Sequence, residues 1–134
     1  MNELEMRRKS GKRQNAGFTL VELMVVVAII AILATTAGLY LFGALDDADQ
    51  TKAMTEIRNL KSAVTAYMIR HRRLPDSLEQ VAEFMDPPRI PNDPWGNQYV
   101  YTKVDSRNFR IVSYGANGAA GGTGVDADIS SDDL

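Results

Sequence analysis

The chain has 134 residues, which is room for one modest domain and one long appendage, and its formal net charge is −2. It contains no cysteine, so a disulfide, a thiolate metal site and a thiol nucleophile are excluded. Basic residues crowd the start of the chain (Arg7, Arg8, Lys9, Lys12, Arg13). Because this basic start runs into an apolar segment and has no aromatic residues for base stacking, we expect no nucleic-acid partner.

The apolar segment, residues 18–45, is interrupted by a single charge, Glu22. As a helix it would be ~42 Å long, which exceeds the ~30 Å hydrocarbon core of a bilayer. The positive-inside rule keeps the preceding basic cluster in the cytoplasm. We therefore expect a single-pass inner-membrane protein whose N-terminus is cytoplasmic and whose globular domain is periplasmic.

Two other interpretations of this segment are open. An ordinary signal peptide would be cut after a shorter apolar core, for which Thr35-Thr36-Ala37 could serve. A simple membrane anchor would not be cut at all. Neither accounts for Glu22, because a carboxylate within an apolar span is costly and usually has a partner or a function.

Residues 17–22, Gly-Phe-Thr-Leu-Val-Glu, resemble the type IV prepilin cleavage motif. The resemblance implies that a prepilin peptidase cuts after Gly17 and methylates the new amine of Phe18, and that Glu22 meets the amine of a neighbouring subunit during polymerisation. Residues 1–17 are then a leader peptide, residues 18–45 a transmembrane and polymerisation helix, and residues 46–134 a periplasmic domain. Many pilins have a proline where this chain has Leu39, so its neighbouring glycines predict either local loosening or close helix packing.

The pattern beyond residue 45 predicts that the same helix continues. Apolar residues recur there at intervals of three and four (Ala53, Ile57, Leu60, Val64, Tyr67, Met68). A cationic turn at residues 70–73 and then Pro75 end the helix. His71 is the only histidine, and we interpret it as a solvated residue at the helix end rather than a ligand or a base.

A short second helix is expected at residues 78–84, capped by Asp76 or Ser77, before a proline-rich surface loop at residues 86–94. Residues 98–104 and 109–113 read as two strands of an antiparallel hairpin with a turn at residues 105–108. The hairpin would pack on the amphipathic half of the long helix. The predicted fold class is therefore α+β, with a long N-terminal helix on a small antiparallel sheet, as in type IV pilins.

The C-terminal half resembles the major pseudopilin of type II secretion systems. The resemblance rests on Asp-Pro-Trp-Gly-Asn at residues 93–97, Ser-Tyr-Gly-Ala-Asn-Gly at 113–118, the glycine pair at 121–122 and Asp-Ala-Asp-Ile at 126–129. It is weakest between Pro75 and Pro91 and at residues 130–132, where the family often has Gly-Asn-Trp. We interpret Trp95 as a packing anchor.

The same resemblance implies a calcium ion held by the glycine-rich loop. Calcium takes ~6–8 oxygen ligands, and the loop offers Asn117, Asp126, Asp128 and the carbonyl of Tyr114. The family usually has aspartate in place of Asn117, so we expect weaker binding. The alternative is a flexible Gly/Asp tail that binds nothing.

The resemblance implies a structural subunit that forms a periplasmic filament and helps to drive folded proteins across the outer membrane. The expected partners are other copies of the chain, minor pseudopilins, the prepilin peptidase, a cytoplasmic assembly ATPase and an inner-membrane assembly platform. A surface pilin for adhesion or motility is the alternative, although many such pilins carry a disulfide loop. A membrane-anchored enzyme or binding protein is the third hypothesis, and no nucleophile–base pair, zinc spacing or phosphate loop supports it.

Overall fold

The computed structural model describes residues 17–134. The expected leader and the basic cluster lie outside the described residues, except for Gly17. The chain divides into two compact units, one ending at Leu39 and one spanning Tyr40–Leu134.

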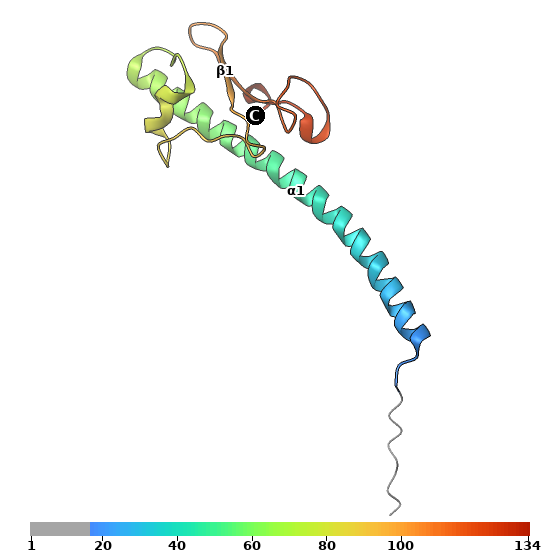
Figure 1. Cartoon of the computed structure of the whole chain (residues 1–134). Coiled ribbons are helices and arrows are strands. Elements are labelled where there is room, and N and C mark those ends of the chain that lie inside the picture. The colour runs from blue at the N-terminus through green and yellow to red at the C-terminus, as the bar shows by residue number, and fades with distance from the viewer. Residues whose placement is uncertain (1–16) are drawn as a thin grey trace, which may run out of the picture. The chain divides into compact units, whose positions relative to one another are not determined.

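Helix α1 (Leu20–His71) begins in the first unit and ends in the second (Figure 1). It is the one helix within residues 17–134 that is long and apolar enough to cross a membrane. The helix continues through Gly38 and Gly43, so the structure does not show the loosening that these glycines could permit. Thr35 and Thr36 lie inside the helix, and each hydroxyl donates a 2.9 Å hydrogen bond back to the helix backbone. These hydroxyls are thereby satisfied without water.

The second half of α1 forms the base of the second unit, as its periodicity predicts. Its buried side chains recur every three or four residues (Ala53, Ile57, Leu60, Ala63, Val64, Tyr67). The helix ends at His71 because Arg72 adopts a left-handed conformation, with φ 59°, and its N–H donates to the Met68 carbonyl at 2.8 Å. The expected end of the helix is therefore confirmed to within two residues.

A three-stranded antiparallel sheet of order β1-β2-β3 completes this unit. Strand β1 (Val100–Lys103) pairs with β2 (Phe109–Ser113), which confirms the hairpin with a first strand shorter than expected. The carboxylate of Asp105 accepts hydrogen bonds from the N–H groups of Arg107 and Asn108 and so closes the hairpin turn. The sequence did not predict β3 (Ile129–Ser130), which pairs with the end of β2.

The expected second helix is present with its predicted bounds as η1 (Leu78–Phe84), but it is a 3₁₀-helix. Two further 3₁₀ turns, η2 (Gly124–Asp126) and η3 (Ser131–Asp133), flank β3. Ser77 is at the N-cap position of η1 without making a side-chain cap, and the Gln80 side chain instead accepts from the Asp76 N–H at 2.9 Å. A 3₁₀-helix has poorer hydrogen-bond geometry than an α-helix, so η1 depends mainly on burying Leu78 and Val81.

The core of the second unit lies between α1 and the sheet (Figure 1). Ile57 and Leu60 of α1 and Ile111 of β2 are fully buried there. Trp95 is partly buried and packs against this core, as expected of an anchor. The α+β fold class is confirmed.

Candidate functional site

The expected cleavage site lies just before α1. Gly17 and Phe18 are exposed and precede the first helical residue, and the Phe18 side chain is 88% accessible. A peptidase could reach this bond without unwinding the helix.

Glu22 caps the helix that it belongs to. Its carboxylate accepts a hydrogen bond from the Thr19 N–H at 2.8 Å, and the Thr19 hydroxyl accepts one from the Glu22 N–H at 3.1 Å. This reciprocal arrangement is a capping box, which satisfies two N–H groups that the helix cannot. The role of Thr19 was not predicted, although the Thr-x-x-Glu spacing is a signal for it.

The second region with candidate functional residues is the loop at residues 93–97, and Asp93 makes its main hydrogen bonds. Its side chain is 3% exposed and accepts hydrogen bonds from the Ser113 hydroxyl (2.7 Å), the Asn97 N–H (2.7 Å) and the Trp95 N–H (3.2 Å). Asn97 in turn donates through Nδ2 to the Gly115 carbonyl at 3.0 Å. A buried carboxylate is stabilised when its oxygens are hydrogen-bonded in this way. Asp93 therefore fixes the loop at residues 93–97 against the end of β2 and the start of the glycine-rich loop.

The glycine-rich loop folds back closely on itself, and two glycines make this possible. A side chain on Gly115 would come within 2.6 Å of the Val125 carbonyl oxygen, and one on Gly122 within 2.5 Å of the Asp126 carbonyl oxygen. Both glycines also have positive φ, 67° and 115°. The Ala116 N–H donates to the Val125 carbonyl at 2.9 Å. The loop is therefore an ordered turn-rich structure with its two ends held together.

The four residues expected at the calcium site all lie in or beside this loop. Tyr114 follows β2, and Asn117 is in the turn at residues 115–118. Asp126 ends η2, and Asp128 directly precedes β3. Asp128 accepts from the Gly121 N–H at 3.0 Å, and Asn117 accepts from the Ala119 N–H at 3.0 Å. Within residues 17–134 no group of three or more His, Cys, Asp and Glu side chains gathers as a metal cluster.

A hard cation in this loop would therefore depend on amide and backbone carbonyl oxygens as well as on the two carboxylates. Backbone carbonyl oxygens lie close to the two glycines: those of Val125 and Ala127 lie beside Gly115, and that of Asp126 lies beside Gly122. Oxygen ligands of mixed charge are what calcium accepts. The types of oxygen donor in the loop are compatible with calcium, and the site itself stays a prediction.

The loop is also tied to α1. The side-chain amide of Gln50 donates to the Gly124 carbonyl at 3.1 Å. Lys61 donates to the main-chain oxygens of Ser131 (3.1 Å) and Leu134 (3.2 Å). Hydrogen bonds at two positions of α1, Gln50 and Lys61, thus join the helix to the C-terminal segment.

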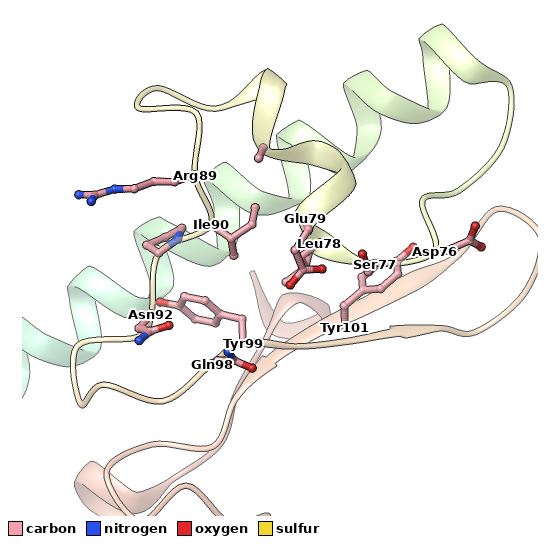
Figure 2. A pocket seen from close by; sticks show the side chains of 12 residues that line it. Asp76, Ser77, Leu78, Glu79, Arg89, Ile90, Asn92, Gln98, Tyr99 and Tyr101 are labelled. Carbon is pink, nitrogen blue, oxygen red and sulfur yellow. The ribbon is translucent and has the colours of Figure 1, made fainter.

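A separate cavity of about 500 Å³ opens between η1, residues 89–92 and β1 (Figure 2). The two tyrosines that line it have structural hydrogen bonds: the Tyr99 hydroxyl donates to Glu56 at 2.5 Å and the Tyr101 hydroxyl to the Pro75 carbonyl at 3.0 Å. Burial raises the pKa of Tyr99 above its ordinary value, and the hydrogen bond to Glu56 adds to this effect. Burial likewise raises the pKa of Tyr101. Both tyrosines are neutral donors at physiological pH.

The exposed apolar first half of α1 and the small antiparallel sheet on its second half define a membrane-anchored, pilin-like α+β subunit. Two family models match the chain: the prokaryotic N-terminal methylation motif over residues 12–38 and type II secretion system protein G over residues 40–132. The chain belongs to the type II secretion system protein G family, the major pseudopilins.

Individual relatives agree with the family assignment. The chain is 35% identical over 133 residues to the type II secretion system core protein G of Vibrio cholerae, covering 87% of this chain and 91% of the relative. It is 32% identical to the core protein G of Pseudomonas aeruginosa, covering 88% and 95%, and 30% identical to that of Escherichia coli, covering 78% and 84%. The predicted pseudopilin of type II secretion is confirmed, and no finding favours a surface pilin. The methylation motif makes the chain a substrate of a prepilin peptidase within a secretion system.

Proposed function

We propose that the chain is inserted in the inner membrane with its N-terminus in the cytoplasm, cut between Gly17 and Phe18, methylated at the Phe18 amine and polymerised into a periplasmic pseudopilus. The filament helps to move folded proteins across the outer membrane. The role of the subunit is structural, and the chemistry belongs to the prepilin peptidase and the assembly ATPase. The inner-membrane platform would add subunits, and minor pseudopilins would join the same filament.

The observation that carries this proposal is the exposed apolar surface of α1. Large apolar side chains from Leu20 to Leu45 are between 48% and 84% exposed. A soluble monomer rarely exposes a contiguous apolar patch of this extent, and such a patch marks a membrane or protein contact. The same surface can serve first in lipid and then against other copies of the helix.

Glu22 is the residue through which this proposal can be tested. In the lipid or in the filament core, its carboxylate and the Phe18 amine of a neighbour would reduce each other's desolvation cost. The capping box introduces a second role, because removing the side chain also removes a helix cap. Glutamine can replace glutamate in a capping box but carries no charge.

We therefore compare Glu22→Ala and Glu22→Gln in a secretion-competent strain. Mass spectrometry of the mature N-terminus should show that both variants are cut and methylated. Electron microscopy should show that both form few filaments, because both lack the charge. Normal filaments from Glu22→Gln would mean that Glu22 serves only as a cap and would refute the charge pairing.

We also propose that the glycine-rich loop binds calcium through Asp126 and Asp128, with contributions from Asn117 and the Tyr114 carbonyl. The ion would supply positive charge that holds the two ends of the loop together. Linkage predicts about 2.7 kcal/mol of added stability when calcium is a hundredfold above its Kd. The close approach of the backbone carbonyls around Gly115 supports the proposal.

Thermal unfolding in calcium and in chelator tests this site. Asp128→Ala should abolish most of the calcium-dependent rise in Tm, and in chelator it should lose only the effect of its hydrogen bond to Gly121. Asn117→Asp should increase the calcium-dependent rise because it adds one negative charge. If calcium leaves the Tm of the unaltered chain unchanged, the ion has no part in the function.

A further inference from the structure

Two large apolar side chains are exposed in the described chain beyond Leu45. Ile69 is 70% exposed and Val104 is 60% exposed. Ile69 lies near the end of α1, and Val104 lies at the entry to the hairpin turn. Ile69 lines a cleft together with Arg72 and with Arg107 of the hairpin turn. We call Ile69, Val104, Arg72 and Arg107 the basic-apolar patch.

The two arginines of this patch have no carboxylate partner among the described residues. The ion pairs in residues 17–134 use other basic groups (Lys52, His71, Arg73, Lys103, Arg110). An apolar centre rimmed by arginine is typical of a protein contact, because arginine is enriched at interfaces.

A surface with the opposite charge and a similar apolar centre lies on α1 near the start of the second unit. Phe42, Leu45, Asp46 and Asp49 are spaced at i, i+3, i+4 and i+7, so they form one stripe along α1. Phe42 and Leu45 are 69% and 52% exposed, and the two aspartates take part in no ion pair within residues 17–134. We call these four residues the acidic-apolar stripe.

Ile69 of the patch and the four residues of the stripe lie on opposite sides of α1. The stripe is centred about 24 residues before Ile69, which is roughly 35 Å along an α-helix. At about 100° per residue, the four stripe positions lie between about 140° and 240° around the helix from Ile69. Two parallel copies packed side by side bring opposite sides of their helices together. A copy shifted by roughly 35 Å would therefore bring its stripe onto the patch of its neighbour.

We propose that the basic-apolar patch of one subunit docks the acidic-apolar stripe of a second copy of this chain. Ile69 packs against Phe42 and Leu45 of the second copy, while Arg72 and Arg107 pair with its aspartates. Because the two surfaces are different and do not overlap, each copy can bind one neighbour on each side. In such a heterologous contact each subunit uses one surface toward one neighbour and the other surface toward the next. Because each neighbour is also shifted along the helix axis, the subunits cannot close into a ring and form an open filament. The inference rests on the proposed function and adds a contact between the end of the apolar helix segment of one subunit and the second unit of its neighbour.

Disulfide cross-linking can test this contact, because the chain has no cysteine of its own. We would express full-length Leu45→Cys/Ser106→Cys in a secretion-competent strain, since Ser106 lines the cleft beside Arg107 and carries no charge. The matched control is Leu45→Cys/Asn59→Cys. Asn59 is also exposed, but it lies about 40° around α1 from Leu45, on the side of the stripe. Oxidation should give a ladder of cross-linked multimers with the first pair and little with the second.

A second comparison tests the charges. Adding Arg72→Gln and Arg107→Gln to the first pair should reduce the ladder about fivefold, as expected for two exposed ion pairs. Adding Arg110→Gln should leave the ladder unchanged, because Arg110 pairs with Asp132 of its own chain. An unchanged ladder after the double arginine replacement would overturn the proposed contact.

Electron microscopy of the same cells separates this proposal from the proposed function. Filaments without a ladder from Leu45→Cys/Ser106→Cys would overturn only the docking surfaces. If the unaltered chain forms no filaments, both the contact and the proposed polymerisation fail.

Discussion

Replacing Asp93 should be the most damaging single polar change in the second unit. In Asp93→Ala the Ser113 hydroxyl and the N–H groups of Trp95 and Asn97 lose their acceptor. A hydrogen bond to a charged group contributes about 1.5–3 kcal/mol. Ser113 is fully buried, so the loss of its hydrogen bond is counted in full. Trp95 and Asn97 are half-buried, and their N–H groups can bind water in the variant, so the loss of their hydrogen bonds is counted in part. The expected loss is about 3 kcal/mol of unfolding free energy.

A loss of this size would lower the Tm by about 12–24 °C, at about 4–8 °C per kcal/mol for a domain of 60–100 residues. The assay is the fluorescence of Trp95, the only tryptophan, during thermal unfolding of the full chain in detergent. Asp76→Ala is the matched control, because Asp76 is an exposed carboxylate paired with Lys103 and Arg73. Its Tm should change little. Equal shifts in the two variants would refute the role assigned to the buried network.

Two further predictions concern the loop and the core. Gly115→Ala should destabilise the second unit by more than Gly96→Ala. Both glycines have positive φ, but only at Gly115 would a side chain meet the backbone, 2.6 Å from the Val125 oxygen. Urea unfolding followed by fluorescence would compare the two variants. Tyr99 should make the protein sensitive to alkali. Its pKa in the folded state lies above its value near 10 in the unfolded state, so above pH 10 the unfolded state loses a proton that the folded state keeps. Unfolding free energy should fall by up to about 1.4 kcal/mol per pH unit there, and Tyr99→Phe should flatten this slope in denaturant titrations between pH 9 and 11; an unchanged slope would contradict the assignment.

The segments with regularly spaced apolar residues, and those bounded by turn or helix-stop residues, were predictable from the sequence. The three- and four-residue spacing from Ala53 to Tyr67 and the stop before Pro75 gave the second half of α1. The turn-rich residues 105–108 gave the hairpin. These signals are local, so they survive without any knowledge of tertiary contacts.

The remaining features depend on contacts between distant residues. Strand β3 has two residues and shows no periodicity of its own, and it exists because Ile129 pairs with Ser113 across the sheet. The role of Asp93 depends on Ser113, twenty positions away. The four residues of the expected calcium site were named from a family resemblance and stay a prediction. The packing of Gly115 against Val125 could be seen only in the folded loop.

The hydrogen bond from Gln50 to Gly124 has a mechanical consequence. Gln50 is the earliest residue of α1 in the second unit whose side chain hydrogen-bonds to a segment distant in sequence. A filament that pushes on its cargo loads its helices in compression, and a slender rod under compression buckles in its unsupported length. The hydrogen bond from Gln50 joins the glycine-rich loop to α1 just before the first buried residue of the helix, Ala53, so the supported length would begin near this point. The stiffness of that loop would then limit how much thrust a subunit can transmit.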